Sequence, residues 1–227
     1  MRQGPRILIV VTSHASLGDT GRATGLWLEE VVVPYRTFVT HGAQVDIASP
    51  AGGAAPVDPR STTTAEHDVE ALLGDSDAQA KLQNTLRLED VEADYDAVFL
   101  AGGHGVMWDL IDSPVLCRLV ARLFDAGKVV AAVCHGSAVL VGVTLGNGAP
   151  LIRGRRVTGF TNDEEDALGL RDVVPFLIET QMRVQGAEFC RGERWAPHTI
   201  RDGRLVTGQN SRSSAETAKQ VLAALRA

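Results

Sequence analysis

The sequence has little of what marks several protein classes. Its three cysteines are widely spaced and form no Cys-x-x-Cys pair, which argues against a disulfide framework or a zinc site and for a reducing compartment. The net charge of −6 gives no electrostatic case for binding nucleic acid. No apolar run approaches the length of a transmembrane helix, and Met1 leads almost at once into a strand without a signal-peptide pattern. We therefore expect a cytoplasmic protein with no membrane and no nucleic-acid partner.

What the sequence does contain is an ordinary globular composition, with 44% hydrophobic and 22% charged residues in a chain of 227. A chain of this length can bury a substantial core. We predict one domain over residues 1–227. A small insertion is expected around residues 50–90, which begin in a stretch rich in Pro, Gly, Ala and Ser.

Apolar runs and amphipathic segments alternate along the chain. The expected strands are 6–11, 44–49, 94–100, 129–133 and 156–160, followed by a late hairpin or edge strands in 187–207. The expected helices are 24–41 with a break at Pro34, an interrupted segment 67–88, then 114–126, 175–183 and 214–226. This alternation predicts an α/β fold with a doubly wound, mostly parallel sheet sandwiched by helices. Ligands bind such sheets at the carboxyl ends of the strands, where the loops after several of these strands should meet.

Cys134 stands where a buried apolar strand changes into a helix. Gly136 follows it closely, and a small residue lets the chain turn sharply there. The pattern is typical of a nucleophile elbow, in which a strand-to-helix turn presents one side chain above the sheet. The N–H groups at a helix N-terminus favour a thiolate, so we interpret Cys134 as an activated nucleophile. The alternative is a cysteine buried in a core strand. Cys117 and Cys190 are interpreted as structural.

Backbone N–H groups could bind an oxyanion that develops beside this sulfur. One belongs to His135, and a second could come from Gly103 in the Gly102-Gly103-His104-Gly105 loop. A plain glycine-rich turn is the alternative for this loop. His104 could contact substrate there or be structural.

Carboxyl groups could move protons near the thiol. Glu30 lies beside Glu29 in a largely apolar segment, where burial would raise the pKa of a carboxyl and let it share a proton with the thiol. Exposure of both carboxyls on a helix flank is the alternative. His135 would need an acid to orient its ring, and the acidic run 162–166 offers Asp163 and Glu165.

These motifs resemble the ThiJ/PfpI superfamily, whose members have a flavodoxin-like, class I glutamine-amidotransferase-like fold. The chain is most similar to the branch of small stress-induced proteins with glutathione-independent glyoxalase (glyoxalase III) and holding-chaperone activity. The matching segments follow the family's order over nearly the whole chain. They are 25–35, 101–105, 130–136, 157–165 and 202–210.

The resemblance implies a role for each candidate. Cys134 would be the catalytic nucleophile with His135 beside it, Glu30 the carboxyl that contacts the sulfur, and Glu165 the acid that orients the histidine. The stretch 161–165 differs slightly from the family pattern, so Asp163 and Glu164 stay open as partners of His135. The oxyanion hole and substrate contacts would come from Gly102, Gly103 and His104.

The function implied is a cysteine-dependent glyoxalase that converts a small-molecule 2-oxoaldehyde such as methylglyoxal to a 2-hydroxy acid such as lactate. Protein deglycase activity would be a related capacity. The resemblance implies no cofactor, metal or glutathione, and it implies a homodimer. Two alternatives stay open: a stress-response holding chaperone or oxidation sensor, and a cysteine peptidase or amidase. Within the second, an amidotransferase is disfavoured, because no His-x-Glu pair follows Cys134.

Overall fold

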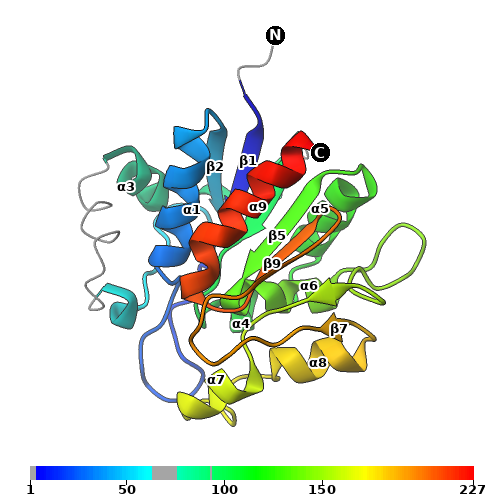
Figure 1. The fold of residues 1–227 in the computed structure, drawn as a ribbon. Helices are drawn as coiled ribbons and strands as arrows, with labels where there is room; N and C mark the ends of the chain where they lie inside the picture. The colour runs from blue at the N-terminus through cyan, green and yellow to red at the C-terminus, as the bar shows by residue number, and fades with distance from the viewer. Residues whose placement is uncertain (1–3, 63–75, 93) are drawn as a thin grey trace.

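The computed structural model describes residues 4–62, 76–92 and 94–227, and its centre is a seven-stranded sheet (Figure 1). The strand order is β3-β2-β1-β4-β5-β9-β8, and every neighbouring pair is parallel except β8 and β9. The strands are β1 (Arg6–Val10), β2 (Gln44–Ser49), β3 (Leu86–Arg87), β4 (Ala97–Leu100), β5 (Val129–Val133), β8 (Thr199–Asp202) and β9 (Leu205–Gly208). A second, two-stranded sheet pairs β6 (Arg156–Val157) with β7 (Glu188–Phe189) in parallel.

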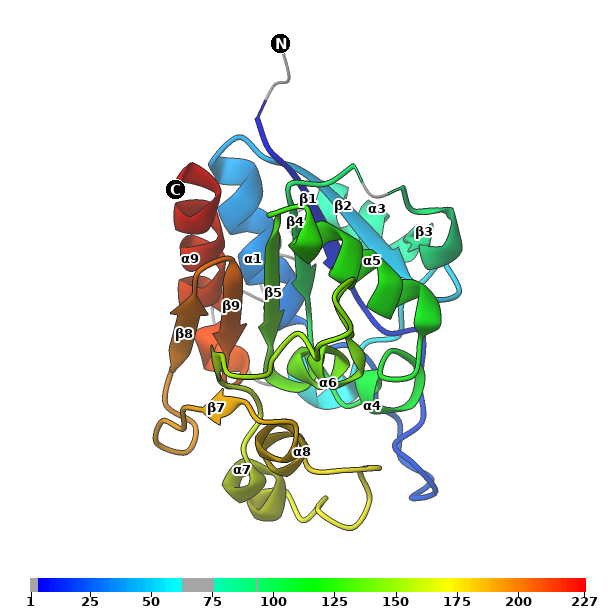
Figure 2. The same cartoon turned by 90° about the vertical axis from the view of Figure 1, so that its right-hand side faces the viewer.

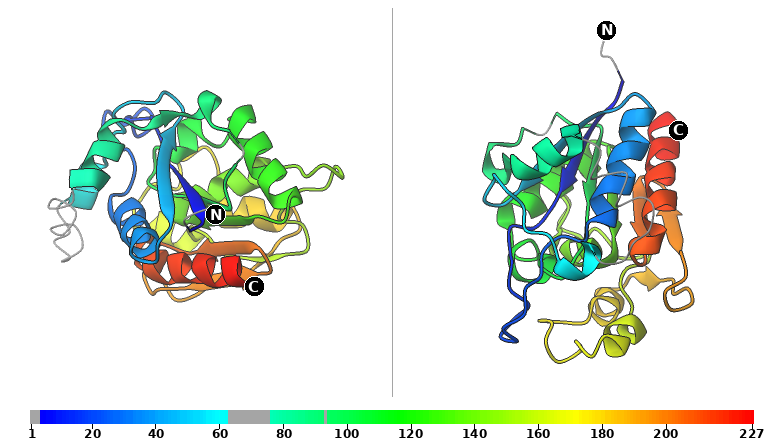
Figure 3. Two further views of the ribbon diagram at one scale, coloured as in Figure 1. Left: turned by 90° about the horizontal axis from the view of Figure 1, so that it is seen from above. Right: turned by 90° about the vertical axis from the view of Figure 1, so that its left-hand side faces the viewer.

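Helices cover both faces of the central sheet, as Figures 2 and 3 show. On one face α1 (Glu29–Thr40) and α9 (Ser214–Arg226) lie against each other, and α5 (Pro114–Asp125) lies on the other. The shorter helices are α3 (Ser76–Gln83), α4 (Val106–Asp109), α6 (Val139–Gly142), α7 (Asn162–Ala167) and α8 (Ile178–Val184). Short 3-10 turns are η1 (Pro59–Thr62), η2 (Leu88–Asp90), η3 (Cys134–Ala138) and η4 (Ser211–Ser213). This is the doubly wound, mostly parallel α/β arrangement that the sequence predicted.

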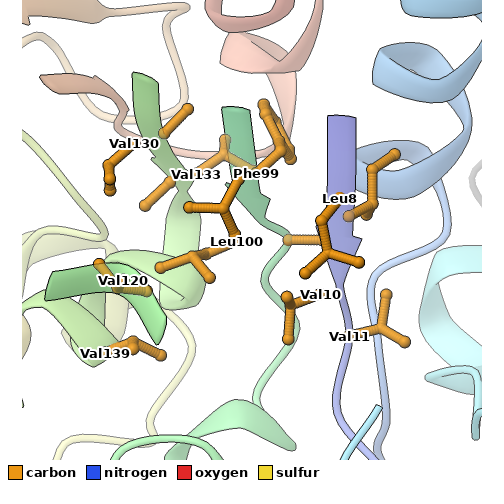
Figure 4. Packing of buried hydrophobic residues seen from close by; sticks show 14 of the residues in the cluster. Leu8, Val10, Val11, Phe99, Leu100, Val120, Val130, Val133 and Val139 are labelled. Atoms are coloured by element: carbon orange, nitrogen blue, oxygen red, sulfur yellow. The ribbon is translucent and has the colours of Figure 1, made fainter. Parts of the chain in front are cut away.

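The central strands are apolar along their whole length because both of their faces are covered. All residues of β4 and β5 are buried. Figure 4 shows side chains from β1, β4 and β5 packed together, with Val120 of α5 and Val139 of α6 beside them. The sheet is therefore a rigid platform whose strand ends can hold side chains in fixed positions.

The helices α7 and α8 lie beyond the carboxyl ends of the central strands (Figures 1 and 2), while β6 lies beside β8. The predicted strand 156–160 is only two residues long as β6 and is absent from the central sheet. Its partner β7 belongs to the region predicted to form a late hairpin or edge strands, and the predicted hairpin around Asp202-Gly203 is present between β8 and β9. Both strands of the small sheet serve to hold α7 and α8 over the end of the central sheet.

Two other predictions about elements need correction. The first helix begins at Glu29 and not at Thr24, because Leu26 bridges to Val57 in extended conformation. Pro34 lies inside α1 without ending it. The predicted helical segment 67–88 lies partly outside the described residues; its described part holds α3, then the edge strand β3, which the sequence did not reveal. In the described part of the chain, no helix combines the length and apolarity needed to cross a membrane.

Candidate active site

Cys134 lies at the carboxyl end of β5, at the first residue of η3. Its backbone has φ of 56°, a left-handed conformation that costs energy for any residue but glycine. A Cβ at Gly136 would lie 2.2 Å from the carbonyl oxygen of Leu100, so only glycine lets the chain turn this closely to β4. The sharp turn that the sequence predicted is therefore present, although a 3-10 turn and not an α-helix follows it directly.

The thiol of Cys134 is less activated than the sequence suggested. The residue is 6% exposed, and burial together with the nearby Glu30 carboxyl raises the pKa of the thiol well above its ordinary value. The N–H of His135 works in the opposite direction but is outweighed. The expectation of a lowered thiol pKa is wrong for the resting protein. A partner that takes the proton is therefore needed.

Glu30 projects from the first turn of α1 and is completely buried. One carboxyl oxygen, Oε2, accepts a hydrogen bond of 2.7 Å from the N–H of Gly102. The other, Oε1, is buried and has no hydrogen-bond partner among the described residues. Burial raises the pKa of Glu30 to about 8, while its interaction with the Cys134 thiol and the Gly102 N–H pull the other way. The exposed alternative is therefore wrong, and the carboxyl can share a proton with the thiol near neutral pH.

The first two glycines of the loop after β4 have different roles. The Gly102 N–H is used to hold Glu30, so it is not available to a substrate. Gly103 lines the pocket beside Cys134 with φ of 101°, and a Cβ there would lie 2.3 Å from the Gly25 carbonyl oxygen. Glycine at 103 thus lets this loop pack closely against the backbone of residues 25–27.

Glu165, the fourth residue of α7, joins two histidines. Its Oε2 lies 2.8 Å from Nε2 of His135, and its Oε1 lies 3.0 Å from Nε2 of His104. The other ring nitrogen of His135, Nδ1, lies 3.4 Å from the Cys134 sulfur. Burial works against the charge on Glu165, but its interactions with His135 and His104 hold the pKa of this carboxyl well below its usual range. An ionised carboxylate therefore orients His135 toward the thiol.

The neighbouring acids make different contacts. The Glu164 carboxylate is buried and accepts hydrogen bonds from the Trp195 N–H and from the Asn210 side chain. It also closes a capping box with Thr161 at the start of α7. Asp163 faces the surface, where it pairs with arginines. Of the three acids that the sequence left open, Glu165 is the one that contacts His135.

The pocket above Cys134 has a volume of about 150 Å³. Its lining includes the aromatic side chains of Trp27, Phe160 and Trp195. Sequence reasoning missed Arg60 and Arg212, which also line the pocket. Neither arginine belongs to a motif, so only the fold brings them here.

The residues of this pocket form a hydrogen-bond network. Among the described residues, one group of potential ligands, His104, His135 and Glu165, has its donor atoms within 4.8 Å of one another. Both imidazoles turn Nε2 to a carboxylate oxygen at hydrogen-bond distance. The remaining nitrogen of His104 faces the guanidinium of Arg60, an unfavourable neighbour for a cation.

Comparison with known proteins places this geometry in a family. Residues 23–224 match the model of the DJ-1/PfpI family. The chain is 31% identical to glyoxalase 3 of Candida albicans, covering 96% of this chain and 98% of that protein. It is also 31% identical to the glutathione-independent glyoxalase HSP31 of Saccharomyces cerevisiae, with 97% and 98% covered.

Solved structures agree with these sequence matches. The crystal structure of Candida albicans glyoxalase III has a TM-score of 0.90 at 31% identity, covering 97% of both chains. The Rapid Encystment Protein 24 kDa of Francisella tularensis has a TM-score of 0.93 at 36% identity, covering 97% of this chain and 99% of that one. The fold and the superfamily expected from the sequence are confirmed. The chain belongs to the DJ-1/PfpI family.

Proposed function

We propose that this protein is a glutathione-independent glyoxalase that converts 2-oxoaldehydes such as methylglyoxal to 2-hydroxy acids. One observation carries the proposal. In a single pocket the Cys134 thiol faces a buried carboxyl, Glu30, whose pKa is raised to about 8, and a histidine oriented by Glu165. The relatives named as glyoxalases, matched over nearly their whole length, support the same activity.

The first step is addition of the thiol to the aldehyde carbon. His135 Nδ1, 3.4 Å from the sulfur, takes the thiol proton as the S–C bond forms. The N–H groups of His135 and Gly103 stabilise the oxyanion. The product of this step is a hemithioacetal on Cys134.

The second step moves a proton between adjacent carbons. Glu30 takes the proton from the former aldehyde carbon and returns it to the neighbouring carbon, through an enediol, which leaves a thioester. A carboxyl with a pKa of about 8 suits this double role because it can both accept and donate a proton near neutral pH. Water then hydrolyses the thioester and releases the 2-hydroxy acid. The sequence is an internal redox isomerisation plus one water, so it needs no external oxidant.

The test is formation of lactate from methylglyoxal by the purified protein without glutathione. Cys134→Ala is expected to abolish the activity, because no nucleophile remains. Cys117→Ala is the matched control, since Cys117 is a half-buried cysteine that does not line the pocket. Lactate formation that survives in Cys134→Ala would overturn the mechanism.

The alternative functions stay predictions. No contact among the described residues singles out client holding, deglycase or amidase activity. The low exposure and raised pKa of the Cys134 thiol disfavour an oxidation sensor, because oxidation follows thiolate character and access. The homodimer also stays a prediction, which analytical ultracentrifugation would test.

A further inference from the structure

The hydrogen-bond network of the active site extends past Glu165 to a residue that no motif contains. Arg60, in η1, places Nη2 3.3 Å from Nδ1 of His104. His104 in turn bonds to Glu165, which holds His135. The contacts thus run without interruption from a guanidinium at the pocket wall to the Cys134 sulfur.

The guanidinium of Arg60 is itself held in place by further hydrogen bonds. Its Nε and Nη2 donate to the two carboxylate oxygens of Asp58 at 3.0 and 2.7 Å, a bidentate pair. Asp58 is fully buried and also accepts from the hydroxyl of Thr24. Burial opposes the charge on Asp58, but the hydrogen bonds from Arg60 and Thr24 leave its pKa lowered. The direction in which the guanidinium points is therefore fixed.

The donor and acceptor roles along this chain follow from chemistry. A guanidinium can only donate, so Nδ1 of His104 must accept and carry no proton. The proton of a neutral His104 then sits on Nε2 and is donated to Glu165. A second proton cannot reach Nδ1 while Arg60 occupies it. Without Arg60, Glu165 would draw that proton onto His104 and form an ion pair with it.

We propose that Arg60 is a positioning residue of the active site, which keeps His104 neutral by donating to its Nδ1 and so reserves the charge of Glu165 for His135. An imidazolium at His104 would compete for the same carboxylate when His135 takes the thiol proton. Arg60 therefore acts through two other side chains and not by touching the reacting atoms. The kinetic part of this inference rests on the proposed function; its spectroscopic part does not.

Three charged and titratable groups surround His104: Arg60 and His135 favour its neutral ring, and Glu165 favours the protonated one. Arg60 comes from η1, Glu165 from α7 and His135 from η3, and the ring centroid of His135 lies 3.9 Å from that of His104. Burial, followed by the neighbouring His135, lowers the pKa of His104 to about 4, and Arg60 adds to this. Removing the guanidinium should therefore let His104 protonate at a higher pH.

The first experiment follows the His104 ring by NMR on histidine labelled with nitrogen-15. In the wild type we expect an unprotonated Nδ1 and a protonated Nε2 down to about pH 5. In Arg60→Met the Nδ1 signal should shift to the protonated form by about one pH unit or more above the wild-type midpoint. Arg60→Lys keeps a charged donor and should restore most of the wild-type behaviour. An unchanged His104 titration in Arg60→Met would overturn the proposal, whether or not the enzyme turns over methylglyoxal.

The second experiment is a double-mutant cycle on kcat. Arg60→Met should lower kcat by about twofold at pH 5, where a midpoint raised by about one unit leaves half of His104 protonated, and should leave kcat unchanged at pH 8, with KM little changed. In a His104→Gln background, which keeps a donor toward Glu165, adding Arg60→Met should cost nothing further. If the losses of kcat in the two single variants multiply, or if KM rises at every pH, Arg60 contacts the substrate and the positioning role is refuted.

Folding of the variants needs its own control. Arg60→Met leaves the buried Asp58 charge without its partner, which can destabilise the protein. The double variant Asp58→Asn with Arg60→Met removes that charge. If it unfolds at the wild-type temperature, yet shows the same His104 shift and the same acid-side loss of kcat, the effect is one of positioning and not of stability.

Discussion

At the residue scale, two groups that hold protons face each other in the pocket. Burial raises the pKa of both the Cys134 thiol and the Glu30 carboxyl. Two buried acids in contact cannot both ionise cheaply, so the pair retains at least one proton near neutral pH. A substrate carbon that accepts the sulfur relieves this repulsion, because the thiolate charge passes to an oxygen that N–H groups can bind.

Replacing Glu30 tests the proton transfer directly. Glu30→Gln keeps an oxygen to accept from the Gly102 N–H, but the amide cannot shuttle a proton between carbons. We expect kcat for methylglyoxal to fall by roughly 100-fold to 10,000-fold, the usual contribution of a general acid or base. Glu29→Gln, one position earlier and outside the pocket lining, should stay within about twofold of the wild type. Equal effects of the two substitutions would remove Glu30 from the mechanism.

The sequence identified most of these residues because each belongs to a local pattern. Cys134 follows an apolar strand and could be recognised without coordinates. The apolar segment around Glu30 left its exposure open, and the family resemblance implied its role. The sign of the thiol pKa shift was missed, since desolvation depends on what packs around the sulfur and not on its neighbours in sequence. Arg60 was missed for a related reason: its contact with His104 spans 44 positions of the chain.

At the scale of elements, the reactive turn depends on how closely η3 approaches β4. The backbone of Gly136 passes so near the Leu100 carbonyl that a Cβ would lie 2.2 Å from its oxygen. That carbonyl is part of a central strand and cannot move without disturbing the sheet. The strained φ of Cys134 is held by the same packing, so the glycine and the cysteine form one structural unit.

Gly136→Ala should therefore damage both fold and activity. The added methyl group would collide with the Leu100 carbonyl, so we expect the free energy of unfolding to fall by several kcal/mol. This loss exceeds the ~1–2 kcal/mol expected where an alanine must adopt a positive φ without such a collision. Gly154→Ala is the matched control, because Gly154 has φ of 70° but nothing within 4 Å of its added Cβ. Urea unfolding and lactate assays on both variants give the comparison. Similar losses in the two would mean that close approach is not what position 136 requires.

The elements of the sheet were predictable where their burial is continuous. The strands β1, β2 and β4, and the helices α5 and α9, lie within two or three residues of the sequence-based bounds. The errors fall on the start of α1, on the edge strand β3 and on short elements outside the central sheet. For instance, Arg156–Val157 reads as a strand but pairs with β7, because a two-residue strand carries too little pattern to specify its partner.

At the scale of the whole molecule, the site lies where the central sheet meets a smaller unit formed by β6, α7, α8 and β7. The central sheet supplies Cys134 and the glycine-rich loop, while α7, held by β6, β7 and α8, supplies Glu165. The parallel strands bring Cys134 and the glycine-rich loop together at their carboxyl ends, as their topology requires. Glu165 reaches the same place because α7 packs over those ends. The same arrangement explains why the sequence could predict a candidate site at the carboxyl ends of the strands but not the α7 and α8 segment that packs over it.

A buried acid also affects the stability of the whole protein as pH changes. The pKa of Glu30 is about 8 in the folded protein and near 4.5 when the chain is unfolded. Between these values the folded state binds more protons than the unfolded state, so stability falls as pH rises. The contribution of the protonated carboxyl is fully present below about pH 4.5 and is lost as pH approaches 8.

The comparison of wild type with Glu30→Gln isolates this contribution. The free energy of unfolding of the wild type minus that of Glu30→Gln should fall between pH 5 and pH 8 by on the order of 4 kcal/mol. Urea unfolding at several pH values measures it. Glu216→Gln, at an exposed position on α9, should give a nearly flat difference over the same range, because that carboxyl stays in water in both states. A difference for Glu30→Gln that is flat or rises with pH would mean that Glu30 is ionised in the folded protein, and the proton it is proposed to share with Cys134 would then have to reside elsewhere.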